Sequence, residues 1–588
     1  MKKRILFVNE ASFLNTGFSN MGHEFIKRLF ATNKYEIAEL GTYVSPEDPR
    51  IASIPWKFYA AQPSQGDKQG WEAYNQPSNQ WGKMAHLGQF GQWALTNVLL
   101  DFQPDFVVGW MDFWMSTVVA DSPLRKMYKH IYMPCIDSTP LRSEWLQMME
   151  NCDYLTAYSM FAYNVMNEQS PKIKTAGFKK LLPHPTRPGV DMNIFKPLDK
   201  KIIREKWHIK EDLPVILTCM RNQGRKLYCE LLESFAKYKK DNLNDPTAQK
   251  AVLLIHSSAY DAGQEYWLQI YRLSELKYMK HHFPGLIKDV LHTFMCDSCG
   301  SRHIDYAIKL LNPQFRNGGA YIQCSVCGQW AAKAPNTNHG YSRQEMAEVF
   351  NLANLYVQVS VAGADEMPIT EAKACGVPVL ASANAAMEEK TIKIQEKNAD
   401  GTPFTMHLGG IPVNIAYTFT DPGTMQNRSY FDKSDLAKKM QILSNTQKLE
   451  DLSKDALVAV KENCNYDNIV KRWEYVFDNL STKDRATTWD KQIDTSTLML
   501  DPITISNSIS DEEFIDLCYT KILKSEIDVV GRVTWLNGLK AGQPRQDVVQ
   551  YFLNVAQKDK MPELLLHNFR QAKTVKLVDI NELKGLIC

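Results

Sequence analysis

The chain has 588 residues, of which 44% are hydrophobic and 23% are charged, and these are ordinary values for a globular protein of roughly three to four domains. Its 68 Lys and Arg residues nearly balance its 66 Asp and Glu residues, so the formal net charge of +2 excludes a global basic field that would draw the chain onto nucleic acid. No apolar run reaches the length of a membrane helix, and the first apolar run, Ile5–Val8, is too short for a signal peptide. With most cysteines scattered singly, these features predict a cytoplasmic protein.

The first 190 residues alternate short apolar runs with amphipathic stretches. Ile5–Val8, Phe106–Val108 and Ile131–Met133 have the composition of buried strands. Between the first two, apolar residues in the segment 25–30 recur at the spacing of a helix. An alternation of strands and helices favours a parallel doubly wound sheet, whose ligands bind beyond the carboxyl ends of the strands.

A proline cluster near residue 190 interrupts this alternation, which then restarts. Val215–Leu217, Val252–Ile255 and Tyr356–Val359 are the next expected strands, so we predict a second doubly wound domain. In chain order the expected units are a first Rossmann-like domain (1–190), a second one (191–464), a helix returning to the first domain (465–480), a Ser-, Thr- and Asp-rich linker (481–505) and a small helical domain (506–588).

Two Cys-x-x-Cys pairs form the strongest local motif. They are Cys296 with Cys299 and Cys324 with Cys327, and each pair is followed by a glycine, as in the knuckle turns of zinc ribbons. Four thiolates leave no open coordination position, so we predict a structural Zn²⁺ in a ribbon at about 293–335. A redox function for the pairs is the less favoured alternative.

The segment between and just after the two pairs combines basic and aromatic side chains, a pattern that suits contacts with a nucleic-acid backbone and stacking on bases. The alternative is a small ribbon held by its metal because it lacks a hydrophobic core. The side chains concerned are Arg302, His303, Tyr306, Lys309, Phe315, Arg316, Tyr321 and Trp330.

The second informative segment runs from Glu366 to Leu380. A polar loop precedes an expected helix opened by Thr370-Glu371, and Gly376 then leads into an apolar strand. The helix N-terminus would offer unpaired backbone N–H groups to an anion. Glu371 could accept hydrogen bonds from ribose hydroxyls, or it could merely complement the helix dipole.

This segment resembles the carboxyl-half motif of family 4 glycosyltransferases of the GT-B fold. Gly189-Val190-Asp191-x-x-x-Phe195-x-Pro197 resembles the interdomain signature of that family, and Leu217–Lys226 resembles the segment that clamps the donor diphosphate. The resemblance covers roughly residues 1–480 and implies two Rossmann-like doubly wound domains. The acceptor would bind the domain 1–190 and the nucleotide sugar the domain 191–464.

The resemblance also implies roles for individual residues. Arg225 and Lys226 would stabilise the diphosphate as it leaves a nucleotide sugar such as a UDP-sugar, and Glu371 would contact the donor ribose. Alignment places the first glutamate of the family motif at Gly363, which lacks a carboxylate, so Glu366 and its neighbour Asp365 are the candidate substitutes. The further donor-binding candidates are Gly17, Asn222, Met367, Pro368, Ile369 and Thr370.

The acceptor side gives weaker signals. Asp137 follows a buried strand and could face the acceptor hydroxyl, although a helix cap is an equally good interpretation. For the family, the resemblance implies transfer with retention by a front-face displacement, in which the leaving diphosphate takes the acceptor proton. No metal is expected in that reaction, and the transferred sugar would be a hexose or a pentose.

Pro134-x-x-Asp137-Ser138 and the tryptophan-rich segment Trp110–Trp114 are similar to glycosyltransferases of large tailed phages. That similarity makes a hydroxymethylated base in phage DNA our weakly favoured acceptor, and the enzyme would then act in the host cytoplasm. A surface glycan or a protein acceptor stays open, as does a non-catalytic nucleic-acid-binding protein on a transferase scaffold. Residues 511–552 resemble a small helical domain of uncharacterised function, which suggests a sugar- or partner-binding appendage.

Overall fold

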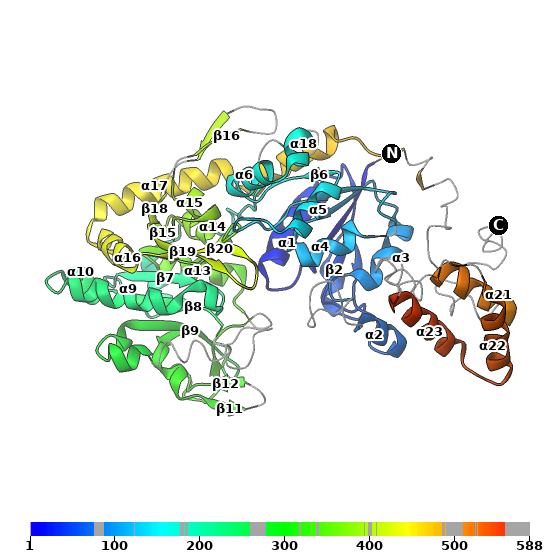
Figure 1. Ribbon diagram of the computed structural model, residues 1–588. Helices are drawn as coiled ribbons and strands as arrows, with labels where there is room; N and C mark the ends of the chain where they lie inside the picture. Colours follow the sequence, from blue (N-terminus) through cyan, green and yellow to red (C-terminus); the bar gives the residue numbers. More distant parts are fainter. Residues whose placement is uncertain are drawn as a thin grey trace.

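Figure 1 shows the computed structural model as two α/β domains lying side by side, with a small helical module beyond the first domain. Strands and helices alternate in both domains, which confirms the predicted fold class. Among the described residues, no helix is both long enough and apolar enough to cross a lipid bilayer. The structure describes residues 2–75, 88–122, 124–176, 181–182, 186–258, 278–316, 319–336, 340–392, 394–397, 403–406, 409–484, 488–489, 510–523, 525 and 527–558.

The first domain is built on a six-stranded parallel sheet of order β3-β2-β1-β4-β5-β6. Its central strand β1 contains the predicted run Ile5–Val8, and these four side chains are buried because helices cover both faces of the sheet. The strand order reverses between β1 and β4, which is where doubly wound sheets bind their ligands. The strands are β1 (Arg4–Glu10), β2 (Glu36–Thr42), β3 (Lys57–Ala60), β4 (Phe106–Gly109), β5 (Lys129–Tyr132) and β6 (Tyr154–Leu155).

Helix α1 follows β1 and positions the loop between them. Thr16 caps it, because its side chain accepts a hydrogen bond from the Ser19 backbone N–H, and its apolar residues Phe25, Ile26 and Leu29 pack into the core beneath the sheet. The helices of this domain are α1 (Gly17–Ala31), α2 (Lys68–Tyr74), α3 (Gln92–Phe102), α4 (Phe113–Ala120), α5 (Ser143–Asn151), α6 (Met160–Gln169) and α7 (Pro171–Ala176), with a 3-10 helix at Pro49–Ser53.

The second domain is built on an eight-stranded sheet of order β10-β9-β8-β7-β14-β15-β18, in which β13 also pairs with β9. The strands from β9 to β18 run parallel, whereas β10 and β13 run antiparallel to β9. All three strands predicted for this half are present. The strands are β7 (Val215–Cys219), β8 (Val252–His256), β9 (Val290–Cys296), β10 (Arg302–Tyr306), β13 (Ala332–Lys333), β14 (Leu355–Gln358), β15 (Val379–Ser382) and β18 (Gly410–Val413).

Helices and three small hairpins surround this second sheet. The hairpins are β11 (Gln314–Arg316) with β12 (Gly319–Tyr321), β16 (Ile394–Lys397) with β17 (Pro403–Met406), and β19 (Ile415–Asp421) with β20 (Gln426–Phe431). The helices are α8 (Lys200–Lys206), α9 (Tyr228–Asp241), α10 (Pro246–Lys250), α13 (Arg343–Leu352), α14 (Met367–Ala374), α15 (Ala385–Glu389), α16 (Lys433–Met440) and α17 (Thr446–Asn463), with 3-10 helices at Gly224–Lys226, Ile287–Asp289, Ala307–Leu311 and Gln441–Ser444.

The chain crosses between the two domains at one place, where the outgoing and returning segments touch. The backbone N–H of Val190 donates to the carbonyl of Cys464 at 2.7 Å. Helix α18 (Tyr466–Asn479) follows the return and packs against α1, with the ring centroids of Trp473 and Phe25 5.4 Å apart. The apolar side chains of α18 therefore pack into the core of the first domain.

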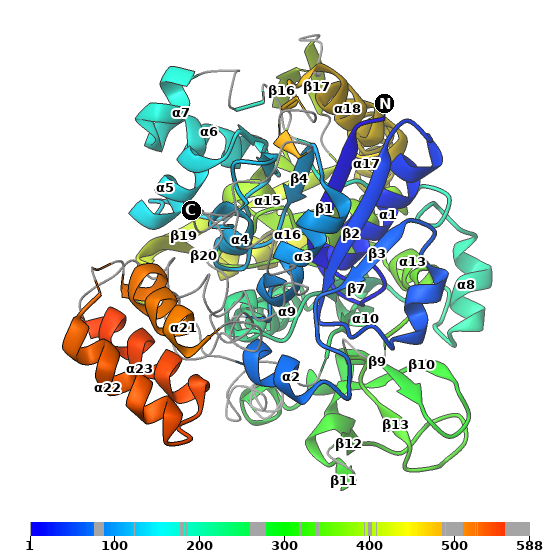
Figure 2. The ribbon, with the colours of Figure 1, turned by 90° about the vertical axis from the view of Figure 1, so that its right-hand side faces the viewer.

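The helical module has its own small core. Apolar residues of α21 (Asp511–Leu517), a π-helical turn at Cys518–Leu523 and α23 (Arg545–Lys558) pack together, and α22 (Val529–Lys540) lies beside them. Figure 2 shows the module and the β10–β13 region projecting at separate places below the two sheets. Most of the expected linker 481–505, and residues 559–588 of the expected helical domain, lie outside the described residues.

Candidate active site and metal centre

A basic loop follows the central strand β7 of the second domain. It contains Asn222, Arg225 and Lys226, and the side chains of Asn222 and Lys226 are almost fully buried. The end of β14 holds this loop in place, because the backbone N–H of Val361 donates to the carbonyl of Arg225 at 2.9 Å. The Arg225 side chain remains 44% exposed, so one cation of the loop is buried and the other faces solvent.

The buried cation meets a carboxylate from the loop before α14. Lys226 Nζ donates to Glu366 Oε1, and the second oxygen of Glu366 accepts from Gln358 Nε2 at 2.9 Å. Arg225 Nη1 lies 4.0 Å from the same carboxylate. Burial alone would raise the pKa of Glu366, but the charges of Lys226 and Arg225 outweigh it and hold that pKa below its ordinary value. Burial and the Arg225 charge lower the pKa of Lys226 to about 8.

Glu366 occupies the space beside Gly363, the position aligned with the first family glutamate. A Cβ atom added at Gly363 would lie 2.7 Å from Cγ and 2.8 Å from Oε1 of Glu366, closer than real contacts allow. Glu366 also has a left-handed backbone, with φ of 58°, which turns its side chain back toward residue 363. A carboxylate therefore stands next to position 363 although the residue there is a glycine.

Helix α14 begins at Met367, so the expectation that it opens at Thr370-Glu371 is wrong by one turn. Pro368 lies in the first turn, a position that proline favours because its missing N–H is not needed there. The side chain of Ile369 is fully buried in the second-domain core, so only its backbone can serve a ligand. Met367 instead packs against the core of the first domain.

A second lysine, Lys390, which is absent from the sequence-based prediction, holds the loop before α14 in place. Lys390 Nζ donates to Asp365 Oδ2 and to Thr370 Oγ1, both at 2.9 Å, and to the carbonyl of Glu366 at 3.3 Å. The Lys390 side chain is only 6% exposed. Because Asp365 and Thr370 are engaged with Lys390, Glu366 is the member of this loop whose carboxylate reaches the basic loop.

Glu371 lies in the second turn of α14 and pairs with Arg343 at the start of α13. Arg343 Nη1 donates to Glu371 Oε1 at 2.7 Å, and the guanidinium stacks over the ring of Phe195 at 4.5 Å. The helix-dipole interpretation of Glu371 is wrong, because that effect is confined to the first turn. The Glu371 carboxylate is buried and charge-paired, which suits a group that receives hydrogen bonds.

Three carboxylates gather at the carboxyl ends of the first-domain strands. Glu10 ends β1, Asp112 follows β4 and Asp137 follows β5. Burial raises the pKa of Glu10, and burial together with the Asp137 charge raises the pKa of Asp112 to about 6. Only Asp137 was among the predicted site residues, since Glu10 and Asp112 have no motif around them.

Asp137 is not a helix cap, which removes that interpretation. The nearest helix, α5, begins at Ser143, and Arg142 occupies its cap position. Asp137 Oδ1 instead accepts a hydrogen bond from Arg428 Nη1 of the second domain at 2.8 Å. The sequence alone gives no sign of this pair, because 291 residues separate its members.

The two domain edges face each other with opposite charge. The charge of Asp137 acts on Lys226, that of Arg225 acts on Asp112, and that of Arg221 acts on Glu10. Gly17 lies on the same side of the first domain, at the exposed N-terminus of α1, and a Cβ there would meet nothing within 4 Å. The structure therefore brings Asp137, Arg225, Lys226 and Glu366 together, while Gly17 offers open space and a helix N-terminus.

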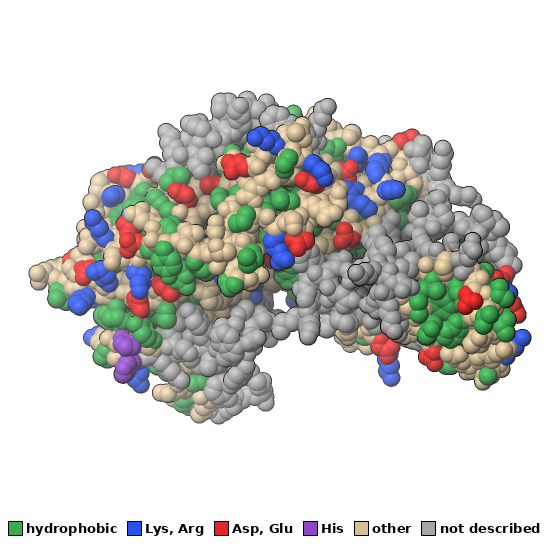
Figure 3. Space-filling model, in the orientation of Figure 1, with side chains coloured by type: hydrophobic (Ala, Val, Ile, Leu, Met, Phe, Trp, Pro, Cys, Tyr) green, Lys and Arg blue, Asp and Glu red, His purple; other side chains and the backbone are tan. Residues whose placement is uncertain are grey.

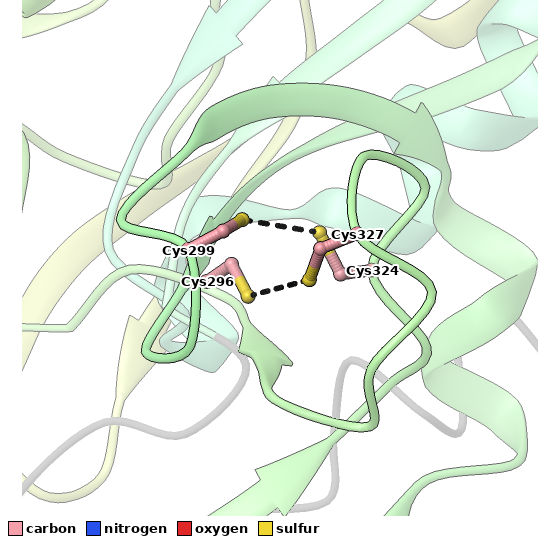
Figure 4. A group of neighbouring side chains, drawn as sticks. All are labelled: Cys296, Cys299, Cys324 and Cys327. Atoms are coloured by element: carbon pink, nitrogen blue, oxygen red, sulfur yellow. Dashed lines mark hydrogen bonds between the residues drawn. The ribbon is translucent and has the colours of Figure 1, made fainter.

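The four cysteines converge as their spacing predicts (Figure 4). Their sulfur atoms all lie within 4.8 Å of one another, with Cys296 Sγ to Cys327 Sγ at 3.7 Å and Cys299 Sγ to Cys324 Sγ at 4.0 Å. A tetrahedral zinc with bonds of about 2.3 Å requires sulfur atoms about 3.8 Å apart, so the donor set fits Zn²⁺. Any metal held there would be structural, because the four thiolates complete its coordination.

Two knuckle turns shape this centre, and each depends on a glycine with positive φ. Gly300 (φ 70°) and Gly328 (φ 75°) donate their backbone N–H groups to the carbonyls of Cys296 and Cys324 at 2.9 and 3.0 Å. Cys296 is the last residue of β9, so the ribbon continues the sheet at its outer edge.

No model of a known protein family matches the chain, and no curated protein matches it in sequence. Solved structures do match over 81–82% of this chain. A sucrose-phosphate synthase from Thermosynechococcus elongatus is 14% identical, with a TM-score of 0.53 and 98% of its own chain covered. A trehalose-6-phosphate protein from E. coli bound with UDP-2-fluoro glucose is 10% identical (TM-score 0.51), and Anabaena HepE in complex with UDP-glucose is 12% identical (TM-score 0.50), each covered over its whole length.

At sequence identities this low, the similarity to these solved structures establishes the fold of the chain and nothing beyond the fold. Both Rossmann-like domains take part in it, because the matched share of the chain exceeds what either domain alone could supply. The protein therefore has the GT-B arrangement of two facing Rossmann-like domains, with a four-cysteine ribbon at the edge of the second sheet and a separate helical module.

Proposed function

We propose that the protein is a cytoplasmic glycosyltransferase that moves a sugar from a nucleotide-sugar donor to an acceptor hydroxyl. The observation that carries this proposal is the meeting of Lys226 and Glu366 at the domain interface, opposite Asp137 and Asp112. A diphosphate needs cations, and a sugar needs hydrogen-bond acceptors for its hydroxyls. Both kinds of group stand here at the carboxyl ends of facing parallel sheets, where α/β proteins bind nucleotides.

On the donor side, Arg225 and Lys226 would bind the diphosphate. With a pKa of about 8, Lys226 is protonated at neutral pH and can neutralise the charge that develops on the leaving nucleotide. Arg225 is exposed enough to reach a ligand from the solvent side. Asn222 would support the diphosphate from the buried side of the same loop.

Glu366 would contact the donor sugar in place of a glutamate at position 363. The support is geometric, since the Glu366 carboxylate already lies where a side chain at 363 would begin. Glu371, buried and paired with Arg343, would accept hydrogen bonds from the ribose hydroxyls. Met367 to Thr370 would contribute backbone groups of the first turn of α14 to the same donor site.

We further propose family 4 chemistry with retention of configuration. In a front-face displacement the acceptor oxygen bonds to the anomeric carbon as the bond to the diphosphate breaks. The acceptor proton passes to the released diphosphate oxygen, so no protein nucleophile is needed. In this route Lys226 would stabilise the charge that develops on the leaving diphosphate.

For the acceptor we propose a hydroxymethylated base in DNA of the tailed-phage type. Tyr306 and Trp330 of the ribbon are 50% and 37% exposed, as a base-stacking surface requires. Against phosphate binding, Lys309 and Lys333 are paired with carboxylates at 2.6 and 2.7 Å. Figure 3 shows basic and acidic side chains interspersed over the described part of one face, so any DNA contact would be local.

A donor and acceptor panel tests the proposal. The full chain is incubated with radiolabelled UDP-glucose and other nucleotide sugars, together with hydroxymethylated DNA, unmodified DNA, oligosaccharides or buffer alone. We expect nucleotide release from at least one donor, and label in hydroxymethylated DNA but not in unmodified DNA. Label only in an oligosaccharide would remove the DNA acceptor, and no binding or turnover of any donor would remove the transferase function.

A further inference from the structure

The hairpin β19–β20 follows β18 and precedes α16 in the chain, and it extends from the second domain to the first. On its own side, the Ser429 backbone N–H donates to the carbonyl of Val361 at 2.9 Å, next to the segment that holds Arg225. On the other side, the Asn427 backbone N–H donates to the carbonyl of Thr139 at 2.6 Å. Figure 1 places β20 at the junction of the two domains. One hairpin therefore contacts both the segment that holds the basic loop and the segment that carries Asp137.

Arg428 is the charged side chain at the centre of this contact. Its Nη1 donates to Asp137 Oδ1 at 2.8 Å and to Ser138 Oγ, while its Nε lies 3.7 Å from Asp421 Oδ2 within the same hairpin. The guanidinium side chain is only 13% exposed. Two anchors, one from each domain, thus fix the arginine, and a fixed arginine holds a carboxylate more rigidly than a lysine would.

The contact leaves the two oxygens of Asp137 in different states. Oδ1 accepts hydrogen bonds from both Arg428 and the hydroxyl of Ser138, the latter at 2.8 Å. Within the described ranges, Oδ2 has no hydrogen-bond partner, and 25% of the Asp137 side chain is exposed to solvent. One oxygen is therefore anchored, and the other is available to a ligand.

We propose that Arg428 is a positioning residue for the acceptor: by holding Oδ1 it directs Oδ2 of Asp137 toward the acceptor hydroxyl. This inference rests on the proposed glycosyltransferase function. Asp137 accepts a hydrogen bond from the hydroxyl and takes no proton, since the proton passes to the released diphosphate as the new glycosidic bond forms. Arg428 belongs to the second domain and Asp137 to the first. Asp137 is therefore oriented only when the two domains have the relative arrangement seen in this structure.

The test compares three variants of the full chain with UDP-glucose as the probe. Arg428→Ala removes the anchor, Arg428→Lys keeps a charge, and Gln426→Ala removes a neighbouring cross-domain hydrogen bond, to the carbonyl of Ser138, without touching the Asp137 carboxylate. Calorimetry measures UDP-glucose affinity, and release of UDP measures turnover with the acceptor found in the panel or with water.

For Arg428→Ala we expect an unchanged UDP-glucose dissociation constant and a loss of turnover on the order of tens to a hundredfold, the effect of misplacing one reacting group. Arg428→Lys should recover part of the turnover, and Gln426→Ala should keep it. In an Asp137→Ala background, Arg428→Ala should add no further loss, because both changes remove the same contact.

Full turnover in Arg428→Ala overturns the proposal, as does an equal loss in Gln426→Ala, which would assign the effect to domain contact in general. If Arg428→Ala does not fold, Arg428→Lys decides in its place: alone it should lose part of the turnover, and in the Asp137→Ala background it should add no further loss. Absence of binding of every nucleotide sugar in the panel by the unaltered chain overturns the proposed function itself, whereas intact donor binding with additive losses overturns only the role of Arg428.

Discussion

The facing edges of the two domains are built in different ways. The donor edge is assembled within one domain, where Lys226, Gln358 and Lys390 hold the loop that carries Glu366. The acceptor edge depends on both domains, because Asp137 of the first is held by Arg428 of the second. We infer that the donor edge is preformed, whereas the acceptor edge is completed only when the domains meet. Donor binding should therefore tolerate changes at the acceptor edge, and turnover should not.

The largest expected effect comes from removing the buried cation of the donor edge. Lys226→Ala should lower turnover of UDP-glucose by on the order of a hundredfold, because it removes one contact to the developing charge. It also leaves Glu366 buried without its partner, at a cost of about 3–5 kcal/mol in the free energy of unfolding. Steady-state UDP release and thermal unfolding measure the two effects.

The matched control is Lys250→Ala, since Lys250 is an exposed lysine paired with exposed Asp212. It should change neither turnover nor stability measurably. Equal turnover in Lys226→Ala and the unaltered chain would contradict the role of Lys226 and the idea of a donor edge built around it.

Glu366→Gly should have a smaller effect and weaken UDP-glucose binding about tenfold. It removes a carboxylate that would accept a charge-assisted hydrogen bond from the donor sugar. The swap variant Gly363→Glu/Glu366→Gly should recover part of this loss, because it moves the carboxylate back across the same space. Glycine also suits the left-handed backbone of residue 366. Calorimetric titration measures both variants, and a swap variant no better than Glu366→Gly would show that Glu366 does not replace the residue at 363.

These residues also show what the sequence could and could not predict. The apolar runs at Ile5–Val8 and Val252–Ile255 form strands because a parallel strand covered on both faces must be apolar throughout, which local composition records. The two cysteine pairs meet because their knuckle turns are local and their ligand spacing is fixed by the metal. The predicted start of α14 at Thr370-Glu371 is wrong, because Pro368 marks a first helical turn more firmly than Thr370 marks a cap.

The missed residues have their partners far away in the sequence. Arg428 reaches Asp137 across 291 residues, and Arg343 reaches Glu371 across 28. Nothing in the neighbourhood of an arginine records a contact of this kind, because the tertiary fold, and not the local sequence, brings the partners together. The domain boundaries and the roles of the individual site residues stay predictions.

The pH dependence of UDP-glucose turnover should follow Lys226. Its pKa is lowered to about 8, and the protonated form is the one that binds the diphosphate, so kcat/KM should fall about twofold between pH 7 and pH 8 and more steeply above. Bound donor adds negative charge, which raises this pKa, so the fall in kcat should appear at a higher pH. A flat kcat/KM profile from pH 7 to 9.5 would contradict the assignment.

The smallest effect on the donor edge is expected from the metal centre, which lies at the outer edge of the same sheet. Cys296→Ser should release about one zinc per chain and lower thermal stability. UDP-glucose affinity at a temperature below unfolding should stay within about twofold, because distant sites act independently. Elemental analysis measures the zinc content, and calorimetry measures the affinity. The control is Cys229→Ser, which changes a cysteine outside the cluster and should leave the zinc bound. A donor affinity lost together with the zinc would make the ribbon part of the donor site.

The most direct test of the whole account is calorimetric titration of the full chain with UDP-glucose, repeated on Lys226→Ala and Lys250→Ala. We expect one binding site per chain, with affinity at least about tenfold weaker in Lys226→Ala and unchanged in Lys250→Ala. An unaltered chain that binds neither UDP-glucose nor any other nucleotide sugar of the panel at millimolar concentration, or a Lys226→Ala variant that binds the donor equally well, would contradict a nucleotide-sugar site between the two domains.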